Sequence, residues 1–238
     1  MHIALLSLPL AALALTACAP APGPAAGTLA HPQEAFWQAL SSHCGKTYAG
    51  GLASTDARDA DWAGKRMVAH WAECDETRVA IAFHVEEAPP SSGSEAVGRT
   101  ETSSSSEAVG QKAPWNRSRT WIVTREGTGA DTRLTLKHNH RHADGEADAV
   151  TFYGGTSADA GSASAQDFPV DAESVTLFTR EGLGASLNNV WRIEVAPRGS
   201  ADARFAYQLT RRNDPTRLFR VEIDASAPVE TPPAAWGW

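Results

Sequence analysis

The chain has 238 residues and a formal net charge of −7, from 21 Lys and Arg against 28 Asp and Glu. The basic residues are scattered along the sequence, which argues against nucleic acid as a partner, because such a partner calls for a basic patch or stripe. Its length, once an N-terminal leader is set aside, suits a single domain of about 200 residues.

The N-terminal residues have the features of an export signal. Residues 3–15 form an almost unbroken apolar run, shorter than the about 20 residues that cross a bilayer, and two small residues separate it from Cys18. The sequence Leu-Thr-Ala-Cys at 15–18 resembles the lipobox of bacterial lipoprotein precursors. This resemblance implies that residues 1–17 are removed as a signal peptide and that Cys18 is acylated. The alternatives are a plain secretory signal and an N-terminal core helix.

The expected anchor predicts where the protein works. Residues 18–32 are rich in Pro and Ala, a composition typical of a linker, and would tether the domain to a membrane through the lipid on Cys18. We therefore expect a protein of the bacterial cell envelope that faces the periplasm, at the outer membrane. With Cys18 acylated, Cys44 and Cys74 remain as a pair and favour a disulfide in that oxidising compartment. The alternative is two buried free thiols.

The rest of the chain predicts an all-β fold. Phe36, Trp37 and Leu40 recur at helical spacing and indicate a short helix over 33–42. Apolar and polar residues then alternate in runs that read as half-buried strands, at 46–52, 65–74, 79–85, 118–125, 132–140, 149–153, 174–179, 191–195, 205–209 and 219–223. About ten short strands predict one antiparallel β domain over 33–238, a barrel of lipocalin-like architecture or a sandwich. The barrel is favoured because closure removes exposed strand edges.

Two segments are expected to differ from this pattern. Residues 87–114 are rich in Ser, Gly, Glu and Pro and repeat Ser-Glu-Ala-Val-Gly at 94–98 and 106–110. We expect a disordered loop insertion there, with recruitment of a partner as the alternative. The C-terminal residues 228–238 should form an extended tail whose Trp236 and Trp238 dock on the domain, because exposed indoles are costly.

The densest chemistry lies near residue 140. Residues two apart share a face of a strand, so His138, His140 and His142 should continue the apolar face set by Leu134 and Leu136. If that face lines a barrel, the imidazoles lie at its mouth. Neighbouring imidazoles about 7 Å apart allow two of them to bind one zinc ion. The third ligand would come from one of Asp144, Glu146, Asp148 and His84, or from His142 if the turn at 144–145 brings it back toward the other two histidines.

Three interpretations of the histidines remain open: hydrogen bonding to loop backbone, metal binding, and acid–base catalysis. A second candidate is the strand that carries Arg117, Arg119 and Trp121. Two guanidinium groups on one strand face beside an indole could hold a carboxylate or phosphate. The alternative is that these arginines pair with acids across the sheet and stack on the aromatic ring.

Several short segments together resemble a family of uncharacterised secreted proteobacterial proteins, a resemblance that implies no activity. They are Phe-Trp at 36–37, Cys-Gly at 44–45 with Tyr48 and Gly50, residues 117–121, 137–142, 153–155 and 189–191, and the Pro-Pro-Ala-Ala-Trp-Gly-Trp end. A fainter resemblance to lipocalin-type barrels, through residues 45–50, concerns architecture only.

Three functions follow as hypotheses. The first is a binding module that holds a small apolar ligand in the barrel mouth, with Arg119, His138 and His140 as polar contacts. The second is a metal-dependent or acid–base enzyme centred on His138, His140 and His142. The third is a structural envelope protein without a ligand. The sequence favours binding over catalysis because it contains no nucleophile elbow, HExxH, P-loop or CxxC motif.

Overall fold

The computed structural model describes residues 31–87 and 114–238. The predicted signal peptide, Cys18, nearly all of the predicted tether and the interior of the predicted loop insertion lie outside the described residues. Among the described helices, none has both the length and the apolar character needed to cross a membrane.

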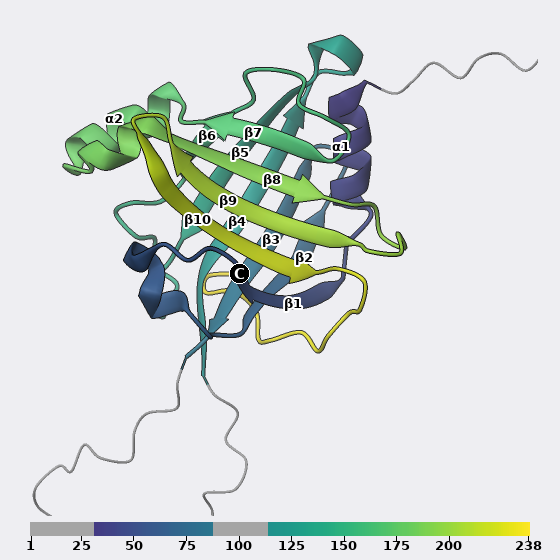
Figure 1. The fold of residues 1–238 in the computed structure, drawn as a ribbon, viewed down its shortest axis with the longest axis horizontal. Helices are drawn as coiled ribbons and strands as arrows, with labels where there is room; N and C mark the ends of the chain where they lie inside the picture. The colour runs from purple at the N-terminus through teal and green to yellow at the C-terminus, as the bar shows by residue number, and fades with distance from the viewer. Residues whose placement is uncertain (1–30, 88–113) are drawn as a thin grey trace, which may run out of the picture.

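Ten strands form one antiparallel sheet that curls into a nearly closed barrel, as predicted (Figure 1). Around the barrel the order is β6-β5-β4-β3-β2-β1-β10-β9-β8-β7. The strands are β1 (Thr47–Leu52), β2 (Met67–Cys74), β3 (Arg78–Glu86), β4 (Trp115–Glu126), β5 (Arg133–His140), β6 (Tyr153–Thr156), β7 (Ala165–Pro169), β8 (Asn189–Val195), β9 (Arg204–Arg211) and β10 (Asp214–Asp224).

The barrel closes where the edge strands β6 and β7 meet. A single antiparallel bridge joins Gly155 to Val170, and the backbones approach so closely that a Cβ on Gly155 would lie 2.2 Å from the carbonyl oxygen of Pro169. Further along the seam, the buried amide of Gln33 donates hydrogen bonds of 3.0 Å to Ser157 Oγ and to Gln166 Oε1. Glycine at the bridge and an amide beside it therefore close the barrel.

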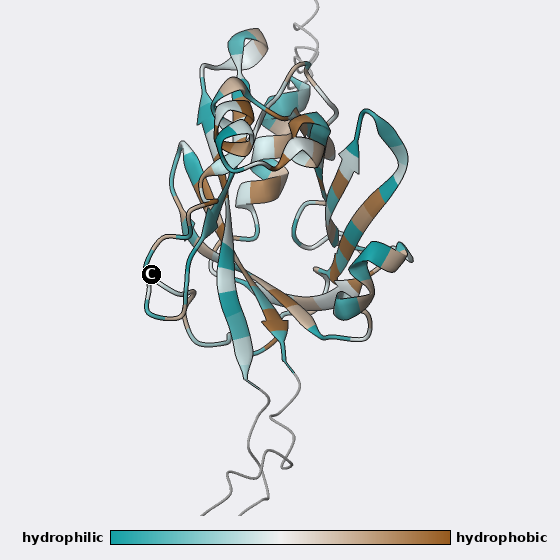
Figure 2. Cartoon of the chain, turned by 90° about the vertical axis from the view of Figure 1, so that its left-hand side faces the viewer, coloured by the Kyte–Doolittle hydropathy of each residue, from teal (hydrophilic) through white to brown (hydrophobic). Residues whose placement is uncertain are grey.

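The interior is filled by side chains, largely aromatic ones. Along β8 the inward residues Trp191, Ile193 and Val195 are buried and alternate with less buried polar ones, and Figure 2 shows such alternation along several strands. The helix α1 (Pro32–Ser41) packs at one end of the barrel and buries Phe36 and Leu40 in the core (Figure 1). In the part of the chain that the structure describes, the barrel interior is thus a packed core.

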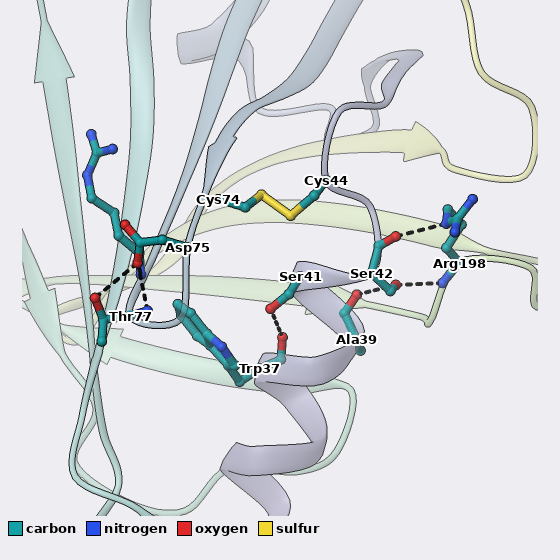
Figure 3. Close-up of a disulfide and its surroundings, with 10 residues drawn as sticks. Trp37, Ala39, Ser41, Ser42, Cys44, Cys74, Asp75, Thr77 and Arg198 are labelled. Atoms are coloured by element: carbon teal, nitrogen blue, oxygen red, sulfur yellow. Dashed lines mark hydrogen bonds between the residues drawn. A yellow bond between two sulfur atoms is a disulfide. The ribbon is translucent and has the colours of Figure 1, made fainter.

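A disulfide between Cys44 and Cys74 ties the segment that follows α1 to the end of β2 (Figure 3). The two Cα atoms lie 6.0 Å apart, a spacing typical of disulfides. The predicted pairing of these two cysteines is confirmed.

The predicted strand at 174–179 is wrong, because this segment is the helix α2 (Ala172–Arg180). Asp171 caps it by accepting a hydrogen bond from the Ser174 backbone N–H, and Arg180 in the last turn suits the helix dipole. Ser174 and Phe178, one turn apart, are its buried residues. Capping and this helical burial outweigh the β propensity of the intervening Val and Thr residues.

The predicted strand at 149–153 is also mostly wrong, since only Tyr153 of this range belongs to a strand. The strand β6 instead continues through Gly154 and Gly155, two residues that in the sequence resemble a turn. A Cβ on Gly154 would lie 1.8 Å from the carbonyl oxygen of Leu136, so close strand approach requires glycine here. β7 was not predicted, because its five residues carry little of the alternating pattern.

The C-terminal tail crosses the outer face of the sheet. Its backbone donates from Val229 N to Thr47 O at 2.8 Å and from Trp236 N to Arg117 O at 3.0 Å. Trp236 and Trp238 also lie against the guanidinium groups of Arg117 and Arg78, at 6.0 and 5.2 Å from ring centroid to Cζ. Beneath the tail, β3 is buried on both faces.

Candidate functional site

The end of the barrel away from α1 carries the sequence-predicted polar residues. Arg125, near the end of β4, pairs with Glu34 of α1 at 2.8 Å, so Arg119, six residues earlier on this strand, lies toward the opposite end. Register places Arg119 beside His140 and Trp121 beside His138. Because Trp121 is a core residue, all four belong to the inner face. We call the end of the barrel bordered by Trp62, Arg119 and His140 the mouth.

An aromatic stack forms the floor of the mouth. The Arg119 guanidinium carbon lies 5.0 Å from the ring centroid of Trp62, which stacks on Phe83 at 6.4 Å. Phe83 stacks on Trp121 at 4.5 Å, and Trp121 on Tyr207 at 4.3 Å. Arg119 therefore lies above four stacked rings, with a cation–π contact to the outermost one.

Trp62 is held in place by a buried ion pair. It belongs to the 3-10 helix η1 (Ala57–Trp62), whose Asp59 accepts two hydrogen bonds from Arg217 of β10, from Nη1 to Oδ2 and, at 2.8 Å, from Nη2 to Oδ1. Asp56 caps η1 by accepting from Arg58 N and also accepts from Arg217 Nη1 at 2.9 Å. This bidentate arrangement fixes the loop that carries Trp62.

His138 lies deep in the barrel, with 5% of the residue exposed. Its Nδ1 is 3.0 Å from the carbonyl oxygen of Tyr153, and its Nε2 is 2.7 Å from the Tyr207 hydroxyl. Since a carbonyl only accepts, Nδ1 carries the hydrogen and Nε2 accepts from Tyr207. Burial lowers the pKa of His138 to about 4. Both ring nitrogens are occupied, which matches the hydrogen-bonding interpretation at this position.

His140 and His142 share a carboxylate partner. Asp148 Oδ2 lies 3.8 Å from His140 Nδ1 and 3.5 Å from His142 Nε2. Burial, reinforced by the positive charge of Arg119, lowers the pKa of His140 below its ordinary value. The structure thus brings His140, His142 and Asp148 together and gives His138 different partners.

Of the other residues considered as metal ligands, Asp144 and Glu146 lie in the turn that follows His142, and His84 lies elsewhere in the barrel. Asp144 Oδ1 accepts from Glu146 N in the turn, and His84 is on the outer face with Nε2 3.1 Å from the Pro233 carbonyl oxygen. In residues 31–87 and 114–238, no group of three or more His, Cys, Asp or Glu side chains has a geometry that could hold a metal ion. A zinc site at the three histidines stays a prediction.

The expectation that Arg117 and Arg119 share a strand face is wrong. β4 contains an irregularity opposite β3, where the register shifts between Phe83 and Val85, and such a bulge re-aims side chains. Arg117 consequently contacts the outer tail, donating to the Ala234 carbonyl oxygen at 2.8 Å. Arg119 contacts Trp62 in the mouth.

Arg119 has no acidic partner among the described residues. Its Nη1 donates to Ser118 Oγ at 2.9 Å, and no described carboxylate lies within 4.0 Å of its guanidinium group. A small cavity of about 170 Å³ adjoins it, lined by Asp61, Trp62, Lys65, Val85, Glu87, Asn116 and Arg119. A guanidinium group that faces inward without a described acidic partner can bind a carboxylate by donating two parallel hydrogen bonds to it.

A second arginine adds positive charge at this end of the barrel. Arg211 donates from Nε to Asn189 Oδ1 at 3.1 Å and likewise has no carboxylate within 4.0 Å in the described ranges. Burial lowers the pKa of Arg211, and the charges of Arg217 and Arg58 lower it further. Arg211 follows Tyr207 and Leu209 at two-residue spacing, so the strand pattern in the sequence could have predicted that it faces inward. Trp62 lies in a segment without periodicity, so no such pattern pointed to it.

Comparison with known proteins adds no further constraint on the site. Neither a family model, nor a curated protein, nor a solved structure matches this chain.

Proposed function

We propose that this protein binds a small amphipathic molecule with a carboxylate at the mouth of the barrel, while a lipid on Cys18 anchors it in the cell envelope. The observation that carries the proposal is the inward guanidinium group of Arg119, which has no described carboxylate partner and lies on an aromatic floor. Because aromatic side chains fill the interior, the ligand would lie at the rim of the barrel.

The chemistry of the mouth fits such a ligand. Small-molecule sites are mostly apolar and hold a few convergent polar groups. Here Trp62 and Phe83 offer apolar surface, Arg119 offers a charged fork, and His140 is its register neighbour. Since burial and Arg119 disfavour the charged form of His140, this imidazole would serve as a neutral hydrogen-bonding group near pH 7.

A fluorescence titration tests the binding proposal. The probe is cis-parinarate, a fluorescent long-chain carboxylate, compared with its uncharged methyl ester. We expect saturable binding of the acid, and we expect Arg119→Gln to weaken it about tenfold or more, the typical worth of a charge-assisted hydrogen bond. The matched control is Arg133→Gln, which alters an exposed arginine of β5 at the opposite end of the strand. Binding of the acid that is equal in wild type and Arg119→Gln would contradict the proposal.

Fractionation tests the anchor separately. The full-length precursor and its Cys18→Ser variant are expressed in a Gram-negative host, and membranes are separated from soluble periplasm. We expect the wild type in the membrane fraction and the variant either soluble or unprocessed. A processed Cys18→Ser protein that still fractionates with membranes would rule out the lipid anchor without affecting the binding proposal.

A further inference from the structure

A second concave surface lies on the outer face of the barrel, separate from the mouth. It has a volume of about 540 Å³ and borders β4, β5 and the end of the C-terminal tail. We call it the outer groove; its lining includes Arg78, Lys137, Arg141, Phe152 and Trp238. None of these residues borders the mouth.

Two exposed aromatic rings line the outer groove. Phe152 is 44% exposed and Trp238 is 38% exposed, and they are the two aromatic residues among the exposed large hydrophobic residues of the described chain. Phe152 also has a φ of 53°, the positive value that disfavours every residue except glycine. Its backbone is held there by a 2.7 Å hydrogen bond from Phe152 N to the His138 carbonyl oxygen. An exposed phenyl ring on a strained backbone indicates a contact surface, because such strain concentrates at ligand clamps.

The outer groove also holds Arg141, which has no acidic partner within the described part of the chain. Arg141 Nη1 donates to the Gly145 carbonyl oxygen at 2.9 Å, its Nε is buried and has no hydrogen-bond partner, and no carboxylate in the described ranges lies within 4.0 Å. The tail packs directly on its stem, since a Cβ on Gly237 would lie 2.4 Å from Arg141 Cδ. Arg141 is thus held in place by the tail, while its positive charge and its Nε–H donor remain without a partner in the described ranges.

The remaining cations of the outer groove have partners. Arg78 forms an ion pair with Glu73 and lies over the Trp238 ring at 5.2 Å. Lys137 forms ion pairs with Asp171 at 2.9 Å and with Glu173 at 2.6 Å. These three acids balance the charges of Arg78 and Lys137. Among the cationic residues that line the outer groove, Arg141 is therefore the one without a carboxylate within 4.0 Å in the described ranges.

We propose that the outer groove is a binding site for a small planar aromatic carboxylate, whose ring packs against Phe152 and Trp238 and whose carboxylate pairs with Arg141. A flat ring matches the two exposed aromatic faces, and a carboxylate complements a guanidinium fork that has no acidic partner among residues 31–87 and 114–238. This site is independent of the mouth and does not rest on the function proposed for it.

Isothermal titration calorimetry with 2-naphthoate tests the proposal, with the uncharged 2-naphthamide as the comparison ligand. We expect saturable binding of the acid with a Kd of about 1 mM or below and at least tenfold weaker binding of the amide. Arg141→Gln should weaken binding of the acid about tenfold. Phe152→Gly should also weaken it without lowering the melting temperature, because glycine relieves the positive φ while the ring is removed.

Two control variants assign the result to the outer groove. Arg133→Gln, an exposed arginine outside both sites, should leave 2-naphthoate binding unchanged. Because the mouth is also proposed to hold a carboxylate, the Arg141→Gln comparison is repeated in an Arg119→Gln background, where binding at the outer groove should persist. Absence of saturable binding, equal binding by Arg141→Gln, or complete loss of binding on Arg119→Gln would overturn the proposal. A concentration-dependent dimer that Phe152→Gly dissociates, seen by analytical ultracentrifugation in the absence of naphthoate binding, would also overturn it by making the groove a contact between copies.

Discussion

The imidazole Nε2 of His138 lies 2.7 Å from the hydroxyl of Tyr207 and so joins β5 to β9, two strands that are not neighbours in the sheet. His43 and Tyr48 repeat the arrangement, with Nδ1 3.0 Å from the hydroxyl and Nε2 2.8 Å from the Ala196 carbonyl oxygen. In both pairs the carbonyl sets the tautomer and the tyrosine donates. The first two predictions concern His138.

Tyr207→Phe should lower the free energy of unfolding by about 1–3 kcal/mol, because it leaves His138 Nε2 as a buried acceptor without a donor. Urea denaturation followed by tryptophan fluorescence measures the change. The matched control is Tyr153→Phe, since the Tyr153 hydroxyl makes no hydrogen bond with a described residue. Equal effects of the two substitutions would show that the bond to His138 contributes nothing specific.

Stability should fall as the pH drops from about 6.5 to about 4. Burial lowers the pKa of both His138 and His84 to about 4, so the unfolded chain binds protons in this range before the folded one does. At pH values below its folded pKa, each histidine therefore lowers the free energy of unfolding by up to about 3 kcal/mol. His84→Gln keeps a donor toward the Pro233 carbonyl oxygen but cannot titrate, so it should flatten the profile. Urea midpoints that stay constant or rise on acidification would disprove this account.

Gly155→Ala should weaken closure of the barrel. The new Cβ would lie 2.2 Å from the Pro169 carbonyl oxygen, and relief of that clash must part β6 from β7 at a cost of about 1–3 kcal/mol. Gly184→Ala is the control, because an added Cβ there meets nothing within 4 Å. Thermal unfolding compares the two variants. A melting temperature that is unchanged in Gly155→Ala would show that the bridge is dispensable.

Loss of the Cys44–Cys74 disulfide should destabilise the domain by about 3–4 kcal/mol, the chain-entropy value for a loop of this length; the two cysteines are 30 residues apart in sequence. The double Cys44→Ser, Cys74→Ser variant should have a correspondingly lower urea midpoint. Dithiothreitol should shift the wild type to the same midpoint and leave the variant where it is. A wild type that is insensitive to reduction while the variant is destabilised would point to packing as the cause.

Local patterns in the sequence predict much of this fold. Trp191, Ile193 and Val195 alternate with polar residues because one face of β8 packs in the core. This alternation can be recognised in the sequence of β8 alone, without knowledge of the strands it pairs with. The spacing of Phe36 and Leu40 likewise predicts α1. These elements carry their own periodicity, so their type and approximate bounds follow from the residues alone.

The tertiary structure decided the elements and side chains whose roles depend on distant residues. The glycines of β6 belong to a strand because Leu136 and Pro169 approach them from other segments. The bulge opposite β3 sends Arg117 outward and Arg119 into the mouth, although residues two apart on a regular strand share a face.

By itself, the sequence thus determined the all-β class and the helix at the start of the domain, because these depend on local periodicity. It favoured the pairing of Cys44 with Cys74 on the expectation that Cys18 carries a lipid, and the structure confirms that pairing. Only the tertiary structure decided where the barrel closes, that Trp62 lies beneath Arg119 in the mouth, and that His138 is buried while His140 and His142 face Asp148. Those features arise from backbone approach, register and burial between segments far apart in the chain, which no local pattern encodes.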